Sequence, residues 1–433
     1  MKNRMSSLKT TGLPWIPFVN STWKITKVKN CFKISKSKAK NENPVILSLA
    51  RDGIKIRDIT KNEGQLATNY SDYNPVLPGD LLLNPMDLYS GANCNMSEVS
   101  GVISPAYSNL RAIVTLNPKF FDFYFKTQYW SMAMFAHGKG VSFDNRWTLN
   151  ADGLLNYEIP FPPFEIQNEI VKILKKKIGI IDSLISNETK QIEKLEEYKK
   201  AVITKAVTKG LDPDAKMKDS DVEWIGKIKQ DYHCEKLKFL LSSPLLYGAN
   251  ESGGKQEKGC TRFIRITDID SNGNLKDTND NQYLSASKST GYILKNKDIL
   301  FARSGGTVGK SFLYKNPGFP CSFAGYLIKA ECEETLLLPE FLYSYTKSSL
   351  YEIWKNMIFV QSTIQNIGAQ RYGNLDIVIP SIAEQKQIVQ YIDKKCMLID
   401  KLIDTKNRTR KQLLNFKKSL IYEYVTGKKK VSL

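Results

Sequence analysis

The sequence is poor in the residues that build metal centres and catalytic triads. It has two histidines, His137 and His233, in 433 residues, and its seven cysteines are scattered without a Cys-x-x-Cys pair. Zinc sites and histidine-based triads need such ligands or partners at suitable spacing. We therefore expect neither, and an odd number of unclustered thiols indicates a chain kept in a reducing compartment.

Long apolar runs are also missing. No stretch reaches the roughly 18 apolar residues of a membrane-spanning helix. Residues 1–19 lack the apolar core of a signal peptide. Together with the unclustered thiols, these absences predict a cytoplasmic protein.

Acidic residues are outnumbered by basic ones. Lys and Arg total 63 against 44 Asp and Glu, which gives a formal net charge of +19. An excess of this size favours a polyanionic partner, nucleic acid first and an anionic membrane second. A lysine-rich proteome would produce the same excess without such a partner, so charge alone does not decide the function.

Proline is absent from one long stretch of the chain. After the cluster that ends at Pro163, residues 164–209 contain no proline and a single glycine, Gly179. Apolar residues recur there at three- and four-residue steps, which is typical of an amphipathic helix. The expected length exceeds that of ordinary globular helices and indicates a coiled-coil element.

The same pattern returns near the C-terminus. Pro162 corresponds to Pro380 and Gln167 to Gln385, an offset of 218 residues, and the match continues without a gap over some fifty positions. A match of this length is poorly explained by chance. The sequence therefore predicts two related long helices.

Shorter segments ahead of the two helices match as well. Trp15-Ile16 corresponds to Trp224-Ile225, whereas the blocks between each lead-in and its helix share little sequence. The chain is thus a tandem duplication with a common frame and divergent interiors. We interpret it as two related binding modules with different targets.

Turn signals divide each variable block into short β-like runs. The strands expected in the first block are 45–49, 53–59, 80–83 and 112–116, and a buried aromatic helix is expected at 119–136. The strands expected in the second block are 261–269, 298–302 and 323–330, followed by a helical run at 339–359.

One segment, SGGTVGKS at 304–311, nearly matches a P-loop. Ser304 occupies the position of the first glycine, and Pro317 follows too soon for the helix that would meet the phosphates. The alternatives are a plain hairpin loop and a flexible basic loop that approaches a DNA backbone. On the second interpretation Arg303, Thr307 and Lys310 are candidate DNA contacts.

Two polar loops precede the long helices at equivalent places, 138–147 and 360–367. Arg reads guanine and Asn or Gln reads adenine in the major groove, so these side-chain types suit base recognition. An ordinary polar loop is the alternative. The candidate DNA-binding residues in these loops are Ser142, Asn145, Arg146, Gln361, Thr363 and Gln365.

No segment offers a convincing active site. Asn84-Pro85-Met86-Asp87 partly matches the NPP(F/Y) motif of amino-methyltransferases, but it lacks the second proline and the aromatic residue that stacks on a flipped base. We interpret this segment as a turn. The chain is expected to be a binding protein with no catalytic residues and no cofactor of its own.

In this order, the motifs resemble the specificity subunit of type I restriction–modification enzymes over essentially the whole chain. The motifs are the two Trp-Ile lead-ins, Gly79-Asp80-Leu81 with Asn84-Pro85-Met86, Lys297-Asp298-Ile299-Leu300 with 303–310, and the Ile-Pro stop before Glu384-Gln385. The first copy departs at Ile166, where the second has Glu384, a difference in a scaffold segment.

The resemblance implies an α+β fold with two mixed α/β target recognition domains, each followed by a long helix, and the two helices pairing as an antiparallel coiled coil. The implied boundaries are recognition domain 1 at 1–160, helix 1 at 161–209, linker and lead-in at 210–231, recognition domain 2 at 232–378 and helix 2 at 379–427. The apolar positions expected in the seam are Ile170, Leu174, Ile181, Leu184, Leu195, Val202, Ile388, Ile392, Ile399, Leu402, Leu413 and Leu420.

The resemblance also implies partners. Each recognition domain would read one half of a bipartite site in double-stranded DNA. Two methyltransferase subunits that use S-adenosylmethionine to methylate adenine, and restriction/translocase subunits that use ATP and Mg²⁺, would join this non-catalytic chain.

A helix of about 45 residues is about 68 Å long at 1.5 Å per residue, or roughly two turns of DNA. The two long helices are therefore expected to fix the distance between the two half-sites on the DNA. The apolar series breaks mid-seam at Glu188 and Lys406. We predict that these two side chains lie within about 11 Å, two helical turns, and set the register.

Three other readings stay open. One is the specificity subunit of a related DNA-methylating defence system, and another is a fused methyltransferase or nuclease, for which no cofactor or metal motif is found. A coiled-coil adaptor without DNA contact is the third, and the net charge of +19 argues against it.

Overall fold

The computed structural model describes residues 8–38, 44–51, 53–58, 70–86, 88, 94–140, 147–270, 273–360 and 366–431. The chain divides into two compact units. The first unit comprises 1–189 with 408–433, and the second comprises 190–407. Two long helices, α4 and α9, each contribute one part to either unit.

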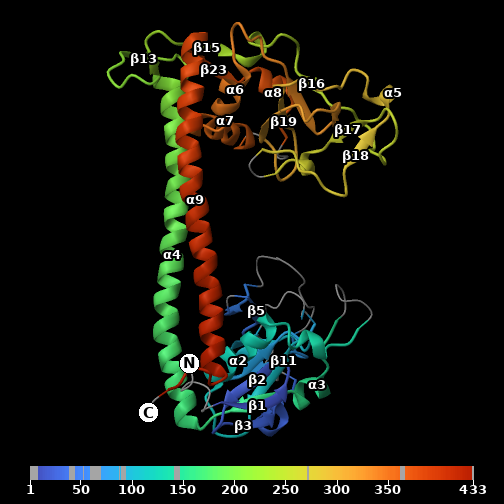
Figure 1. Cartoon of the computed structure of the whole chain (residues 1–433), viewed down its shortest axis with the longest axis vertical. Coiled ribbons are helices and arrows are strands. Elements are labelled where there is room, and N and C mark those ends of the chain that lie inside the picture. The colour runs from blue at the N-terminus through green and yellow to red at the C-terminus, as the bar shows by residue number, and fades with distance from the viewer. Residues whose placement is uncertain are drawn as a thin grey trace. The chain divides into compact units, whose positions relative to one another are not determined.

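The first unit combines short strands with two helices of ordinary length and parts of the long ones (Figure 1). Its strands are β1 Leu8–Leu13, β2 Ile16–Asn20, β3 Lys24–Lys27, β4 Phe32–Ile34, β5 Leu47–Ala50, β6 Gly53–Ile56, β7 Asn74–Val76, β8 Leu81–Leu83, β9 Cys94–Met96, β10 Gly101–Ile103, β11 Ser108–Ala112 and β12 Glu158–Phe161. Its helices are α2 Pro118–Trp130 and α3 Ala151–Asn156, with 3₁₀ turns at Val28–Asn30 and Phe135–His137.

The second unit repeats this plan. Its strands are β13 Met217–Asp219, β14 Lys227–Lys229, β15 His233–Lys236, β16 Leu246–Tyr247, β17 Thr261–Ile264, β18 Gln282–Leu284, β19 Ile299–Ala302, β20 Ser311–Leu313, β21 Cys321–Phe323, β22 Leu327–Ala330 and β23 Asp376–Ile379. Its helices are α5 Ala286–Ser289, α6 Pro339–Tyr345, α7 Ser349–Val360 and α8 Ala369–Gly373, with 3₁₀ turns at Leu237–Phe239 and Ile266–Asp268.

Each unit has a four-stranded antiparallel sheet with the same strand order. The order is β4-β11-β8-β9 in the first unit and β16-β22-β19-β20 in the second. A separate strand pair, β12 with β3 or β23 with β15, leads into the long helix of each unit. The duplication visible in the sequence is therefore present in the strand pairing.

The long helices are α4, Phe164–Lys209, with 46 residues, and α9, Ile382–Val425, with 44 residues. This confirms the prediction of helices from the proline stops and apolar periodicity. Gly210 and Gly427, with φ of +70° each, follow the helix ends, where glycine adopts the left-handed conformation at no steric cost.

A buried glutamine anchors the start of each long helix. Gln167 accepts a hydrogen bond from the Asn117 amide (2.8 Å) and donates one to the Pro162 carbonyl (2.8 Å). Gln385 accepts from the Leu338 amide (2.9 Å) and donates to the Pro380 carbonyl (3.0 Å). Both side chains are fully buried, and each joins the long helix to the N-cap of α2 or α6.

The departure at Ile166 and Glu384 has a local explanation. Glu384 accepts hydrogen bonds from Lys229 (2.8 Å) and from the Tyr232 hydroxyl (2.6 Å), which lie in the second lead-in. In the first copy Trp23 takes the place of Tyr232, and it belongs with Ile166 to an apolar cluster. A polar anchor in one unit is thus replaced by an apolar one in the other.

Five predicted elements need correction. The strand expected at 261–269 ends at Ile264 and is followed by a 3₁₀ turn, and the helix expected at 119–136 ends at Trp130. The strand expected at 112–116 is wrong, because β11 ends at Ala112 and the apolar side chains that follow, Ile113 and Val114, are exposed. The strand expected at 323–330 is two strands, β21 and β22, separated by a turn at Gly325. The helical run at 339–359 is likewise two helices, α6 and α7.

Candidate functional site

The P-loop-like segment is the loop of a β-hairpin. It joins β19 to β20, which pair antiparallel, and the Gly309 amide donates to the Ala302 carbonyl (2.9 Å). A strand follows the loop where a P-loop requires the N-terminus of a helix. The segment therefore lacks the geometry that cradles phosphates in nucleotide-binding proteins.

Arg303 lies at the start of this hairpin loop and is held by three other segments. Its amide donates to the Tyr326 carbonyl (2.9 Å), and its carbonyl accepts from the Ile367 amide (2.9 Å). Its guanidinium lies over the ring of Tyr247, 5.1 Å from the centroid. The Tyr247 hydroxyl in turn accepts from the Ala369 amide (2.8 Å).

The other two candidate DNA contacts of the hairpin, Thr307 and Lys310, lie further along the loop than Arg303. The Thr307 carbonyl accepts from the Lys310 amide (3.0 Å), which closes a tight turn, and the Lys310 side chain is exposed. An exposed ammonium in a tight loop is suited to a phosphate contact.

A group of lysines surrounds the base of the hairpin. The Lys347 ammonium donates to the Ser311 carbonyl and hydroxyl (3.2 Å each). Burial, together with the positive charges of Lys355, Lys199 and Lys310, lowers the pKa of Lys347 to about 8. This side of the second unit is therefore electropositive.

The remaining candidate DNA contacts lie outside the described residues. They are Ser142, Asn145, Arg146, Gln361, Thr363 and Gln365. They stay predictions from the sequence, and Asp87 of the Asn-Pro-Met-Asp segment also lies outside the described residues.

The motif aspartates are structural. Asp80 accepts from the Leu77 amide (2.9 Å) and pairs with Arg111 (2.6 Å). Asp298 accepts from the Lys295 amide (2.8 Å), its carboxylate lies 3.7 Å from the Lys329 ammonium, and burial raises its pKa. These two carboxylates close equivalent turns before the central strands β8 and β19.

Asn84 is also a turn residue, in agreement with our interpretation of its segment. Its side chain accepts from the Met86 amide (3.0 Å), and its carbonyl accepts from the Tyr129 hydroxyl (2.8 Å). Because of these bonds, the Asn84 side-chain amide lies inside the core and is not placed to bind a flipped base.

The long helices carry two ion pairs at equivalent positions. In the first unit Lys417 of α9 pairs with Asp182 of α4 (2.6 Å). In the second unit Lys199 of α4 pairs with Asp400 of α9 (2.7 Å). The offset of 218 residues relates Asp182 to Asp400 and Lys199 to Lys417, so the same contact is made twice with the helices exchanged.

Most of the predicted seam residues are buried. The buried ones are Ile170, Leu174, Ile181, Ile388, Ile392, Ile399 and Leu420, and the partly buried ones are Leu195, Val202 and Leu413. Leu184 and Leu402 are exceptions, with 46% and 52% of their surfaces exposed. Ile185 and Ile403, one residue further along each helix, are partly buried. The place of Leu184 and Leu402 in a seam stays a prediction.

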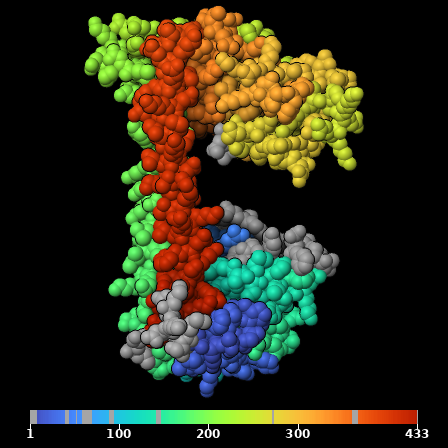
Figure 2. Space-filling view, in the orientation of Figure 1, coloured from blue at the N-terminus to red at the C-terminus, as the bar shows by residue number. Residues whose placement is uncertain are grey.

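The exposed apolar residues of the helices also follow the repeat. Ile180, Leu184 and Phe416 flank the Asp182–Lys417 ion pair in the sequence and are 46–57% exposed. Their equivalents Leu398, Leu402 and Tyr198 flank the other ion pair and are 49–56% exposed. The side of α9 seen in Figure 2 is open at the surface. Sequence reasoning missed these residues as a group, although the repeat relates them.

The middle of the helices contains a polar contact of Lys406, with a residue other than Glu188. The Lys406 ammonium donates to the Gln191 side-chain oxygen. The offset of 218 residues relates Lys406 to Glu188 and Gln191 to Thr409, so Glu188 and Thr409 are the equivalent pair of positions. The direct approach of Glu188 to Lys406 stays a prediction.

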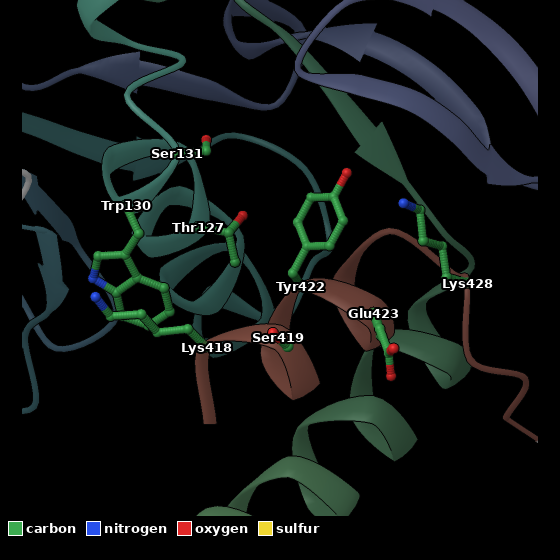
Figure 3. Close-up of a pocket in the computed structure, with 8 residues that line it drawn as sticks. All are labelled: Thr127, Trp130, Ser131, Lys418, Ser419, Tyr422, Glu423 and Lys428. Carbon is green, nitrogen blue, oxygen red and sulfur yellow. The ribbon is translucent and has the colours of Figure 1, made fainter. Parts of the chain in front are cut away.

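A pocket of about 390 Å³ lies in the first unit between the end of α2 and the end of α9 (Figure 3). It is lined by Thr127, Trp130, Ser131, Lys418, Ser419, Tyr422, Glu423 and Lys428. The Lys418 ammonium lies over the Trp130 ring (5.6 Å) and Lys428 over the Tyr422 ring (4.6 Å). These eight residues include no histidine or cysteine and form no nucleophile–base pair.

The described residues hold neither a candidate metal site nor a candidate membrane span. Within the ranges given above, no group of three or more His, Cys, Asp or Glu residues is placed to hold a metal ion. Over the same residues, none of the helices combines the length and apolar character needed to cross a membrane.

Two α/β units with the same sheet order, each containing part of both long helices, make this a duplicated protein. The sequence model of the type I restriction modification DNA specificity domain matches residues 89–197 and 250–415. The chain belongs to this family.

Individual relatives agree with this assignment. The MjaVIII specificity subunit of Methanocaldococcus jannaschii is 26% identical over 287 residues, 64% of this chain and 63% of that protein, so the match spans under two thirds of its length. The EcoBI specificity subunit of Escherichia coli is 22% identical over 395 residues, 86% of this chain and 79% of that protein.

The fold has a solved counterpart. A chain from a structural study of complex assembly and conformational transition in the type I R-M system superposes with a TM-score of 0.69. The two chains are 13% identical over 95% of this chain and 99% of the other. This likeness shows the fold.

Proposed function

We propose that this chain is the DNA-specificity subunit of a type I restriction–modification complex and reads a bipartite, asymmetric DNA site. Each unit binds one half-site. The chain has no catalysis of its own and joins two adenine methyltransferase subunits to restriction/translocase subunits. S-adenosylmethionine, ATP and Mg²⁺ belong to those partners.

The repeated contacts of the two units carry this proposal. Ion pairs Asp182–Lys417 and Lys199–Asp400 are interchanged by the repeat, which is the relation expected of two antiparallel helices about a pseudo-twofold axis. An antiparallel coiled coil of α4 and α9 then spaces the recognition units. A helix of 46 residues spans about 69 Å, roughly two turns of DNA.

The exposed apolar residues of the helices support two identical partners. A cluster of Ile180, Leu184 and Phe416 has its equivalent in Leu398, Leu402 and Tyr198. Large exposed apolar side chains on a helix are typical of protein interfaces. Two copies of one methyltransferase subunit would use these two clusters in the same way, one copy on each.

The charge of the chain supports DNA as the substrate. A net charge of +19, with Lys310 exposed and Arg303 in the same loop, favours binding to phosphates and base edges. Thr307 and the candidate residues of the two polar loops would complete the contacts.

The test is to express this chain with its cognate methyltransferase subunit and to sequence the methylated adenines in a host genome. We expect one bipartite motif with an unspecific spacer and one modified adenine on each strand. Cells that express the methyltransferase subunit alone are the control. Methylation that occurs equally without this chain, or at a short continuous motif, would contradict the proposal.

A further inference from the structure

Arg303 has no ion-pair partner among the described residues, in contrast to Arg111 and Arg265. Arg111 pairs with Asp80 (2.6 Å) and Arg265 with Asp268 (2.9 Å), whereas no carboxylate of the described residues pairs with Arg303. Its guanidinium contacts a tyrosine ring instead, which leaves the planar N–H groups available. Such a group is suited to a ligand with paired acceptors.

The tyrosine under Arg303 is itself fixed in place. Tyr247 belongs to β16, which pairs with β22, and its hydroxyl accepts from the Ala369 amide (2.8 Å). Two neighbouring glycines permit this packing. A Cβ atom on Gly248 would lie 2.3 Å from the Ala324 carbonyl, and one on Gly368 would lie 3.1 Å from the Tyr247 hydroxyl. The platform for the guanidinium is therefore rigid.

An exposed aromatic residue lies beside Arg303. Tyr326 occupies the turn between β21 and β22, and its carbonyl accepts from the Arg303 amide (2.9 Å). The preceding Gly325 amide donates to the Ala249 carbonyl (2.9 Å), so the turn is anchored on both sides. Yet 66% of the Tyr326 surface is exposed, which an aromatic residue with a structural role in the core would not show.

We propose that Arg303 and Tyr326 read adjacent base pairs in the half-site bound by the second unit, and that Tyr247 is a positioning residue for Arg303. This inference rests on the proposed function. The Arg303 fork would donate to O6 and N7 of one guanine in the major groove. The Tyr326 ring would pack against the edge of the neighbouring base pair.

Arg303 is held in one orientation by Tyr247, and this favours a contact to a base over a contact to a phosphate. A phosphate contact requires only charge and tolerates a mobile side chain, as Lys310 on the same loop provides. A bidentate contact to one base requires a planar fork held in a fixed orientation. The platform of Tyr247 supplies that orientation.

The experiment uses the complex of this chain with its methyltransferase subunits to select duplexes from a randomised library, followed by sequencing. Variants are Arg303→Ala, Arg303→Lys, Tyr326→Ala, Tyr247→Leu and Tyr247→Phe, with Lys310→Ala as the phosphate-contact control. Thermal unfolding of each complex verifies that the variant is folded.

We expect Arg303→Ala and Arg303→Lys to lose about tenfold to hundredfold discrimination at a single guanine of one half-site. Tyr326→Ala broadens the neighbouring position of the same half-site. Tyr247→Leu reduces discrimination at that guanine, and Tyr247→Phe, which keeps the ring but loses the hydroxyl bond to the Ala369 amide, reduces it less. Lys310→Ala weakens binding to all sequences alike.

Two results would overturn the inference while leaving the proposed function intact. One is an unchanged motif in the Arg303 variants. The other is a uniform loss of affinity in Arg303→Ala that Arg303→Lys restores, which identifies a phosphate contact. If the unmodified complex selects no half-site at all, the proposed function itself fails.

Discussion

Two buried glutamines show how single side chains fix the geometry of this chain. Gln385 bonds to the Leu338 amide and to the carbonyls of Pro380 and Leu336 (2.9–3.0 Å). Gln167 makes two of the corresponding bonds in the first unit, with the Asn117 amide and the Pro162 carbonyl. Each amide side chain thus satisfies backbone groups of two segments that no regular hydrogen-bond ladder reaches.

Gln385→Ala should destabilise the protein by about 1–3 kcal/mol, because buried backbone donors and acceptors would be left without partners. The measurement is the free energy of unfolding in urea. Gln387→Ala, at an exposed position two residues along the same helix, is the control and should change stability little. Equal effects of the two variants would show that the buried bonds do not matter.

Lys347 predicts a pH dependence of stability. In the folded chain burial lowers its pKa to about 8 from 10.5, so the unfolded chain binds more protons between these values. Stability from this group therefore rises as pH increases from about 8 to 10.5. Lys347→Met should be more stable than the parent by about 1–3 kcal/mol near pH 7, and this advantage should disappear towards pH 10.5.

The measurement for Lys347 is the difference in the free energy of unfolding between parent and variant across this pH range. Taking the difference removes contributions from other titrating groups. An advantage of Lys347→Met that stays constant with pH would show that the ammonium is not destabilised in the folded state.

At the scale of elements, one glycine lets the residue after β16 pack closely against the end of β21. A Cβ atom on Gly248 would lie 2.3 Å from the Ala324 carbonyl and 2.4 Å from that of Phe323. Gly248→Ala should therefore cost about 1–3 kcal/mol, because backbone atoms must move apart. Gly306→Ala, where nothing lies within 4 Å, is the matched control, and neither glycine has a positive φ.

The readouts for the two glycine variants are the midpoint of thermal unfolding and DNA selection by the assembled complex. Gly248→Ala should lower the midpoint and, by displacing Tyr247, loosen the sequence preference as well. A Gly248 variant as stable as the Gly306 variant would contradict the close packing of the strands.

The long helices could be predicted from the sequence because proline stops and a 3.6-residue period are local signals. Local signals failed where apolar residues are exposed, as at Ile113 and Val114 after β11. They also do not separate Leu184, which is exposed, from Ile185, which is partly buried, because adjacent apolar residues carry the same local signal.

The candidate site was accessible to sequence reasoning only in part. Arg303 could be chosen for its residue type and its place in a glycine-rich loop. Tyr247 and Tyr326 could not, since they are separated from each other by many residues and meet Arg303 only through strand pairing. Tertiary contacts of this kind leave no periodic trace in the sequence.

At the scale of the whole molecule, the repeat makes a prediction about stoichiometry. Leu184 and Leu402 are equivalent and about half exposed, so replacing either with glutamate should not unfold the chain. If each lies in the contact with one methyltransferase subunit, a buried unpaired carboxylate would prevent that contact. Leu184→Glu and Leu402→Glu should then each bind a single methyltransferase subunit, and the double variant none.

Native mass spectrometry of the co-expressed complexes measures this stoichiometry directly. Leu336→Glu, at a leucine of similar exposure on the second unit, is the control and should retain two subunits. Two subunits bound to the double variant would place the contacts elsewhere on the chain. Loss of both subunits in either single variant would mean that the two clusters do not act independently, which the interchange of equivalent contacts by the repeat does not predict.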